Sequence, residues 1–175
     1  MKQDTQSKGT KPWILPLAAG IMVVVALIVV IFIPKGADKG TAKPANTVAS
    51  LNEEGNLVIH ADQLSSEQVS FIRISEDSRI ELLARAGKDG TVKAALGTCQ
   101  SCYGSPGAYY TQEGSSLKCN NCGQTFPVSV LDSAGGGCHP IMIHESILTY
   151  QGNDLVIDLE GLSLYEELFA KVADH

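Results

Sequence analysis

The sequence predicts a mainly β domain with a short C-terminal helix, preceded by one N-terminal transmembrane helix. Three observations support this fold class. An uncharged apolar run of 21 residues lies near the N-terminus, short apolar segments separated by turn residues fill the second half, and all five cysteines fall within 40 residues. We therefore expect a domain built around a cysteine-rich site and tethered to a membrane.

The apolar run occupies residues 13–33, which are mostly Val, Ile, Leu and Ala. A helix of this length spans roughly 30 Å, the thickness of the hydrocarbon core of a bilayer. Trp13 stands where an interfacial aromatic residue is expected, with Lys11 just outside it. The run is longer than the apolar region of a signal peptide, and no small-residue cleavage site follows it. The pattern thus predicts an uncleaved anchor after a short cytoplasmic tail, residues 1–12.

The orientation follows from the tail rather than from charge, because three lysines lie on each side of the run. A short N-terminal tail before a single span usually stays in the cytoplasm, which places the rest of the chain outside. Residues 34–50 are rich in Gly, Ala, Lys, Thr and Pro and predict a flexible linker. Residues 51–175 then form the extracytoplasmic domain of a single-pass protein of the cell membrane.

The predicted domain is acidic. From residue 44 onward, the sequence contains seven Lys and Arg residues and seventeen Asp and Glu residues, which gives a net charge of about −10. Nucleic acid is excluded as a partner, because phosphate contacts require a basic face. An acidic surface suits solubility and the attraction of cations or of a basic redox partner.

The domain reads mostly as strands, followed by one helix. Gly87-Lys-Asp-Gly90 separates two apolar segments and predicts a hairpin, while Ser163-Leu-Tyr-Glu166 predicts the capping box of a short C-terminal helix. The stretch from Gly55 to Ser65 resembles the stretch from Gly152 to Ser163, which suggests two strands paired in one sheet. The predicted strands are 57–59, 69–74, 79–85, 91–96, the segment through Leu117, 126–131 and 155–159.

The cysteines form two C-x-x-C pairs and one single residue. Cys99 and Cys102 form the first pair, Cys119 and Cys122 the second, with sixteen residues between the pairs, and Cys138 follows in Gly-Gly-Gly-Cys-His-Pro. Two such turns at this separation can present four thiolates to one metal centre. Thiolates are soft ligands that select zinc, copper(I) and iron–sulfur centres. Cys138 is a fifth candidate metal ligand, and His139 is the histidine with the best claim to lie near the site.

Several motifs in this region resemble the FtrD-like family of membrane iron–sulfur proteins. They are Gly97-Thr-Cys99-Gln-Ser-Cys102-Tyr-Gly104, Ala108-Tyr-Tyr-Thr-Gln-Glu-Gly114, Leu117-Lys-Cys119-Asn-Asn-Cys122-Gly-Gln-Thr-Phe-Pro127 and Gly136-Gly-Cys138 with Pro140. The resemblance covers roughly residues 55–145 and includes all five cysteines, although His139 stands where the family more often has Asn. It implies a membrane-attached iron–sulfur domain associated with bacterial iron transport, with an iron permease or another membrane redox protein as possible partner.

A broader similarity links the cysteine loops to Rieske domains, β-sandwiches whose ligands lie on two hairpin loops. Here Cys99-x-x-Cys102 and Cys119-x-x-Cys122-Gly123 take those places, and the segment from Gly135 to Pro140 falls where a covering loop lies. Both histidines of the Rieske pattern are replaced by cysteine. The resemblance therefore implies a Rieske-like fold whose four thiolates give a [2Fe–2S] centre a lower potential than two histidines would.

Three functions remain open at this point. The first is an iron–sulfur electron-transfer protein that serves iron uptake or reduction. The second is a structural zinc ribbon, which the spacing alone favours. The third is a thiol–disulfide protein, because thiols outside the cytoplasm tend to oxidise. Sequences typical of hydrolysis or phosphoryl transfer are not found, so an electron carrier is favoured over a stand-alone enzyme.

Overall fold

The computed structural model describes residues 48–175. The predicted cytoplasmic tail, the predicted transmembrane helix and all but the last three residues of the predicted linker lie outside the described residues. Within residues 48–175, no helix is long and apolar enough to cross a membrane. The first strand begins at Ala49, in the last two residues of the predicted linker.

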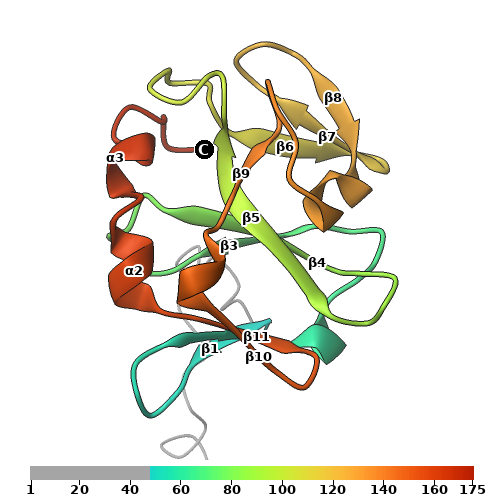
Figure 1. Cartoon of the computed structure of the whole chain (residues 1–175). Helices are drawn as coiled ribbons and strands as arrows, with labels where there is room; N and C mark the ends of the chain where they lie inside the picture. The colour runs from blue at the N-terminus through green and yellow to red at the C-terminus, as the bar shows by residue number, and fades with distance from the viewer. Residues whose placement is uncertain (1–47) are drawn as a thin grey trace, which may run out of the picture. The chain divides into compact units, whose positions relative to one another are not determined.

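The described chain folds into three antiparallel sheets, which confirms the mainly β prediction. One sheet has the order β1-β2-β11-β10, the second β3-β4-β5-β9 and the third β6-β7-β8. Figure 1 shows the β6-β7-β8 sheet at one end of the domain and β1, β10 and β11 at the opposite end, with β3, β4 and β5 between them. The strands are β1 (Ala49–Leu51), β2 (Leu57–Ile59), β3 (Ser70–Arg73), β4 (Glu81–Ala86), β5 (Val92–Cys99), β6 (Tyr110–Glu113), β7 (Ser116–Cys119), β8 (Thr125–Pro127), β9 (Pro140–Met142), β10 (Leu148–Gln151) and β11 (Asp154–Ile157).

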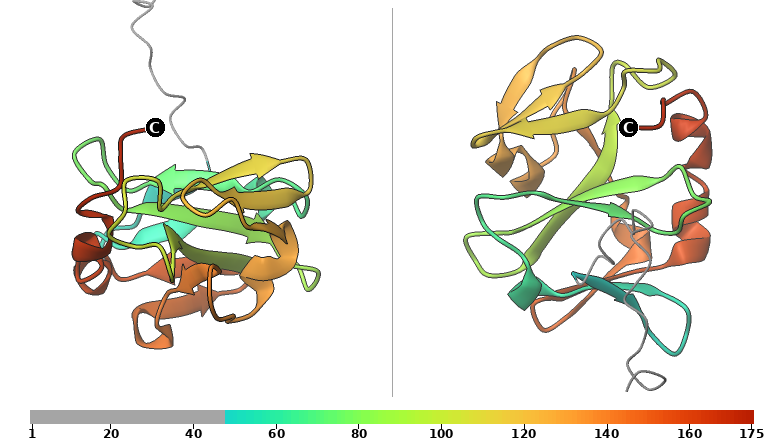
Figure 2. Two further views of the ribbon diagram at one scale, coloured as in Figure 1. Left: turned by 90° about the horizontal axis from the view of Figure 1, so that it is seen from above. Right: turned by 180° about the vertical axis from the view of Figure 1, so that it is seen from behind.

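The middle sheet forms the centre of the core. Five of the six residues of β4 and seven of the eight residues of β5 are buried, so alternation of apolar and polar side chains is lost there. Side chains on both faces of these strands are therefore buried. Figure 2 shows the same strands from above and from behind. The core therefore extends along β5 to its last residue, Cys99.

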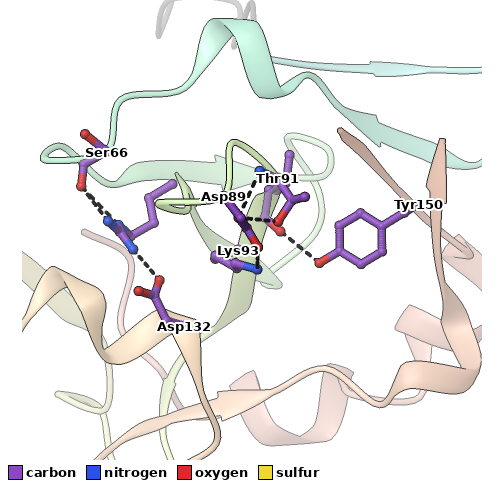
Figure 3. A network of polar contacts seen from close by, with 8 residues as sticks. Ser66, Asp89, Thr91, Lys93, Asp132 and Tyr150 are labelled. Carbon is purple, nitrogen blue, oxygen red and sulfur yellow. Dashed lines mark hydrogen bonds and ion pairs between the residues drawn. The ribbon is translucent and has the colours of Figure 1, made fainter. Parts of the chain in front are cut away.

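The predicted hairpin between β4 and β5 is confirmed. Gly90 has a φ of 79°, and the Asp89 carboxylate accepts hydrogen bonds from the Thr91 backbone and hydroxyl and from the Lys93 ammonium (Figure 3). Lys93, followed by Thr91, lowers the pKa of Asp89. The Tyr150 hydroxyl donates to the Val92 carbonyl and links the hairpin to β10. The segment from Gly87 to Gly90, which predicted the turn, therefore does form it.

A buried arginine connects this hairpin to the segment after β8. The Arg85 guanidinium donates to the Ser66 carbonyl and to the Asp132 carboxylate, and its side chain is 4% exposed. Asp132 ends the 3-10 helix η2 (Val128–Asp132), which directly follows β8. The charge pair thus fixes the chain that leaves the second cysteine pair.

The prediction of a strand over 126–131 is correct only at its start. The strand β8 ends at Pro127, and η2 follows without a gap. Pro127 is tolerated on this edge strand, where it pairs with Ser116, and the chain turns into η2 at Val128, whose N–H donates to the Ser115 carbonyl at 3.0 Å.

The C-terminal helical segment exists as predicted, but the predicted N-cap residue is wrong. Asp158 caps α2 (Leu159–Ser163) by accepting from the Glu160 N–H, and Leu159, predicted in a strand, is helical. Ser163 ends α2, and its hydroxyl donates to the Glu160 carbonyl instead of capping α3 (Glu166–Phe169). An aspartate one residue beyond β11 starts the helix before the Ser-x-x-Glu motif can. Within residues 48–175 the remaining helices are η1 (Ala61–Gln63) and η3 (Glu145–Ile147).

The two similar stretches of sequence do pair in one sheet. β2 and β11 are antiparallel neighbours, with Leu57 opposite Ile157 and Ile59 opposite Leu155. The His60 ring follows β2 and lies between the Ser50 hydroxyl, 2.9 Å from Nε2, and the Asp154 carboxylate, 3.1 Å from Nδ1. The sequence spacing gave no sign of this Ser-His-Asp contact, which links β1, β2 and β11.

We expect Asp154→Asn to lower the stability of the domain to unfolding at neutral pH and to make that stability less dependent on pH. The Ala61 N–H, followed by His60, lowers the pKa of Asp154 below its value in the unfolded chain. The carboxylate therefore contributes stability above about pH 4, which is lost as the pH falls through the folded-state pKa. Thermal unfolding of the full chain in detergent from pH 7 to pH 3 tests this. Equal losses of stability in wild type and variant would contradict it.

Candidate metal centre

Each cysteine pair lies where a strand ends in a tight turn. Cys99 is the last residue of β5, and its carbonyl accepts from the N–H groups of Cys102 and Tyr103, at 3.1 and 2.8 Å. Cys119 is the last residue of β7, and its carbonyl accepts from the Gly123 N–H at 2.8 Å. We call residues 99–103 the first cysteine turn and residues 119–123 the second. Gly123 has a φ of 73°, which explains the glycine after the second pair.

The residue that leads into β6, Tyr109, links the two turns. Tyr109 forms an isolated bridge with Thr98, and its carbonyl accepts from the Asn120 N–H at 2.9 Å. The next residue, Tyr110, pairs with Cys119 in the β6–β7 ladder. One short segment therefore contacts the residue before the first cysteine and the residue after the third.

The four paired cysteines converge. The sulfur atoms of Cys99, Cys102, Cys119 and Cys122 all lie within 4.8 Å of one another. Three of these side chains are buried and Cys122 is exposed, and all five cysteines of the chain are free thiols. The sequence-based expectation that the two turns meet at one point is thus met by the geometry.

The surroundings shift the pKa values of the cysteine thiols in different directions. Burial raises the pKa of Cys99 to about 11, although backbone N–H groups of Ser101 and Cys102 oppose this. Burial likewise raises the pKa of Cys119 to about 12, against the N–H groups of Cys122 and Asn121. The Gln124 N–H lowers the pKa of Cys122 to about 7. Amide groups aimed at sulfur favour thiolates, which are the form that binds metal.

Cys138 lies next to this group without belonging to it. The Cys122 thiol raises the pKa of Cys138, which shows that the two side chains are neighbours. The loop is fixed by the Tyr110 hydroxyl, which donates to the Cys138 carbonyl, and by the Gln100 N–H, which donates to the His139 carbonyl at 2.9 Å. A role for Cys138 as a metal ligand stays a prediction.

The histidines near the site have other contacts. His139 packs edge-on against Phe126, and its Nδ1 is buried without a hydrogen-bond partner among the described residues. His144 caps η3, where its ring nitrogen contacts the Ser146 hydroxyl and N–H. His175 stacks on Tyr109 at 3.9 Å, and the Ala173 N–H donates to the Pro106 carbonyl. The C-terminal segment thus packs on the loop that follows the first cysteine turn, which the sequence did not indicate.

The comparison with protein families decides the identity of the domain. Residues 64–169 match the family described as "Membrane iron-sulfur containing protein FtrD-like". This chain belongs to the FtrD-like family. The match includes all five cysteines, and membrane association and iron–sulfur chemistry are the properties the family description carries. Comparisons with curated proteins and with solved structures give no significant match.

The residues present fit a metal held by sulfur. Four thiols converge, three of them buried, and backbone N–H groups at both turns point at the sulfurs. Such a donor set selects iron or zinc over magnesium or calcium, which require oxygen ligands. In this FtrD-like protein, Cys99, Cys102, Cys119 and Cys122 would hold the metal, which would supply one-electron chemistry if it is iron.

Gly107, in the loop that follows the first cysteine turn, packs closely against the backbone of the second cysteine turn. A Cβ atom on Gly107 would lie 3.2 Å from both the Cα and the N of Asn121, in the second cysteine turn. Backbone atoms cannot swing aside, so Gly107→Ala is expected to displace the turns and weaken metal binding about tenfold. Gly136→Ala is the control, because a Cβ there meets nothing within 4 Å. Chelator competition measures the affinity, and equal affinities in the two variants would contradict the expectation.

Proposed function

We propose that this FtrD-like protein is an electron carrier whose iron is bound by cysteine sulfur and which serves iron uptake or reduction at the cell membrane. The observation that carries the proposal is the convergence of four cysteine sulfurs within 4.8 Å in a member of an iron–sulfur family. Residues 13–33 anchor the chain as a single span. Residues 51–175 lie outside the cytoplasm, on a linker formed by residues 34–50.

The burial of the site suits electron transfer. Cys99 and Cys119 are fully buried, so water is kept from most of the metal, whereas Cys122 is exposed and brings one ligand to the surface. Tyr103, beside the first cysteine turn, is 56% exposed. Electrons can therefore reach the metal through one accessible edge, while fixed N–H groups stabilise the charge on the sulfurs without rearrangement.

The partner we propose is another membrane redox protein or an iron permease. The domain carries a net charge of about −10 from residue 44 onward, which favours a basic docking surface on the partner. A Rieske-like relationship of the two cysteine turns also belongs to this proposal. It is supported by the placement of both turns at strand ends and by the loop of Cys138 beside them.

A structural zinc site is the second candidate, and one observation favours it. Four sulfurs at these distances match the closed tetrahedral site in which zinc supplies folding energy and no redox chemistry. The thiol–disulfide alternative is less well supported, because the first residue of each pair is buried.

Metal analysis and spectroscopy of the full chain test the proposal. The protein is purified anaerobically in detergent, and iron, zinc and free thiols are measured. Iron-containing protein with visible absorption that disappears on reduction and returns on reoxidation supports an electron carrier. Colourless protein with zinc alone would overturn the proposal in favour of the structural site. Metal-free protein with paired disulfides would overturn it in favour of thiol–disulfide chemistry.

A further inference from the structure

We propose that the four cysteines hold a single metal ion with no inorganic sulfide, and that Cys138 stays outside the coordination sphere. This inference rests on the proposed function for the identity of the metal as iron. It goes beyond the family description, which names iron and sulfur without stating whether the sulfur is cysteine alone. It also differs from the [2Fe–2S] centre that the Rieske resemblance implies.

The distances between the sulfur atoms carry the inference. Metal–thiolate bonds of about 2.3 Å in a tetrahedron place four sulfurs about 3.8 Å apart. Two irons bridged by sulfide instead place thiolates on opposite irons roughly 5.5 Å or more apart, with bonds of similar length. All six distances among Cys99, Cys102, Cys119 and Cys122 are 4.8 Å or less. The four sulfurs are therefore spaced to bind one ion and are too close together to hold a two-iron cluster.

The backbone around the site resists expansion. Asn120 in the second cysteine turn donates to the Tyr109 carbonyl at 2.9 Å, and Tyr109 bridges Thr98 directly before the first turn. Moving the turns apart to admit a second iron would stretch these main-chain contacts between elements of the core. These main-chain contacts therefore oppose separation of the two turns.

Coordination by four thiolates also leaves no position for a fifth. A tetrahedral site of four cysteines is closed, so a neighbouring thiol has no vacancy to fill. Cys138 is not one of the four cysteines whose sulfurs lie within 4.8 Å of one another, and its backbone carbonyl accepts a hydrogen bond from the Tyr110 hydroxyl. In this arrangement Cys138 shields the exposed ligand and binds no metal. Binding of one divalent ion requires all four cysteines as thiolates, so the protons that the thiols still hold are released to solvent.

The decisive experiment loads metal-free full chain, reduced and in detergent, with iron(II) under anaerobic conditions, in one sample without sulfide and in a second with excess sulfide. We expect about one iron per chain and no acid-labile sulfide. A requirement for sulfide, or two irons with two sulfides per chain, would overturn the inference and leave the proposed iron carrier intact. Protein isolated from cells with one zinc, no iron and no sulfide would support a single ion and overturn the proposed electron transfer.

Cobalt(II) tests the ligand set by a readout independent of activity. Cobalt bound by four thiolates in a tetrahedron gives intense visible bands together with sulfur-to-metal charge transfer. Cys138→Ser is expected to leave both the stoichiometry and the cobalt spectrum unchanged, whereas Cys122→Ser is expected to weaken and shift the charge-transfer bands. A changed spectrum in Cys138→Ser would overturn the assignment of that residue, because a non-ligand cannot alter the coordination sphere in this way.

Discussion

Cys119→Ser is expected to weaken metal binding at least about 1,000-fold and to lower the melting temperature of the metal-loaded chain. The Cys119 side chain is fully buried at the end of β7, so no water or neighbouring side chain can readily replace it. A serine hydroxyl stays protonated and is a harder ligand than thiolate, and binding at sites of this type contributes about 10–16 kcal/mol. Competition with a chromophoric chelator and thermal unfolding with and without metal measure the two effects.

Cys138→Ser is the matched control for this prediction, because it makes the same chemical change at a neighbouring cysteine outside the group of four. We expect its metal affinity to lie within a few-fold of wild type. A Cys119→Ser variant with the affinity of the Cys138→Ser variant would show that Cys119 is no ligand. The metal-free Cys119→Ser variant should unfold at a lower temperature than metal-free Cys138→Ser, because its hydroxyl replaces a fully buried thiol, so the comparison of the two variants relies on metal affinity.

The ligand spacing was readable from the sequence, whereas the contacts that bring the two turns together were not. Two C-x-x-C turns sixteen residues apart, with Gly123 after the second, predict four thiolates because the turn geometry is local. The role of Tyr109 depends on pairing with Thr98 and Asn120, eleven residues away in each direction. Nothing in the pattern Ala-Tyr-Tyr-Thr distinguishes such a link from a buried strand, so only the three-dimensional structure shows it.

The fold shows the same division between local and distant effects. The β4–β5 hairpin followed from its turn residues, and the resemblance between β2 and β11 indicated their pairing correctly. The helix cap was assigned wrongly because two capping residues, Asp158 and Ser163, compete within six positions. Where β11 ends decides between them, and this depends on pairing with β2 and β10 rather than on the local sequence.

Gly97→Ala is expected to destabilise the metal-free domain by about 2–3 kcal/mol, a cost typical of overpacking in a core. Gly97 lies in β5, two residues before Cys99, opposite the start of β4. A Cβ atom there would lie 2.9 Å from the Glu81 carbonyl oxygen and 3.2 Å from the Glu81 Cβ. Real Cβ atoms do not approach a main-chain oxygen this closely, so β4 and β5 would have to separate. The register of β5 against β9 also shifts between Leu96 and Cys99, so the ladder is already irregular here.

Thermal unfolding of metal-free Gly97→Ala and Gly136→Ala separates strand packing from ligand loss. Gly136 has no atom within 4 Å of an added Cβ and no positive φ, so its alanine variant should match wild type. Gly97→Ala should melt about 10 °C lower, given the size of the domain. Equal melting temperatures would mean that β4 yields at Glu81 without loss of packing. If the expected loss is found, the close approach of β4 and β5 fixes the position from which Cys99 reaches the metal, and weaker metal binding in this variant then follows from displacement of that strand end.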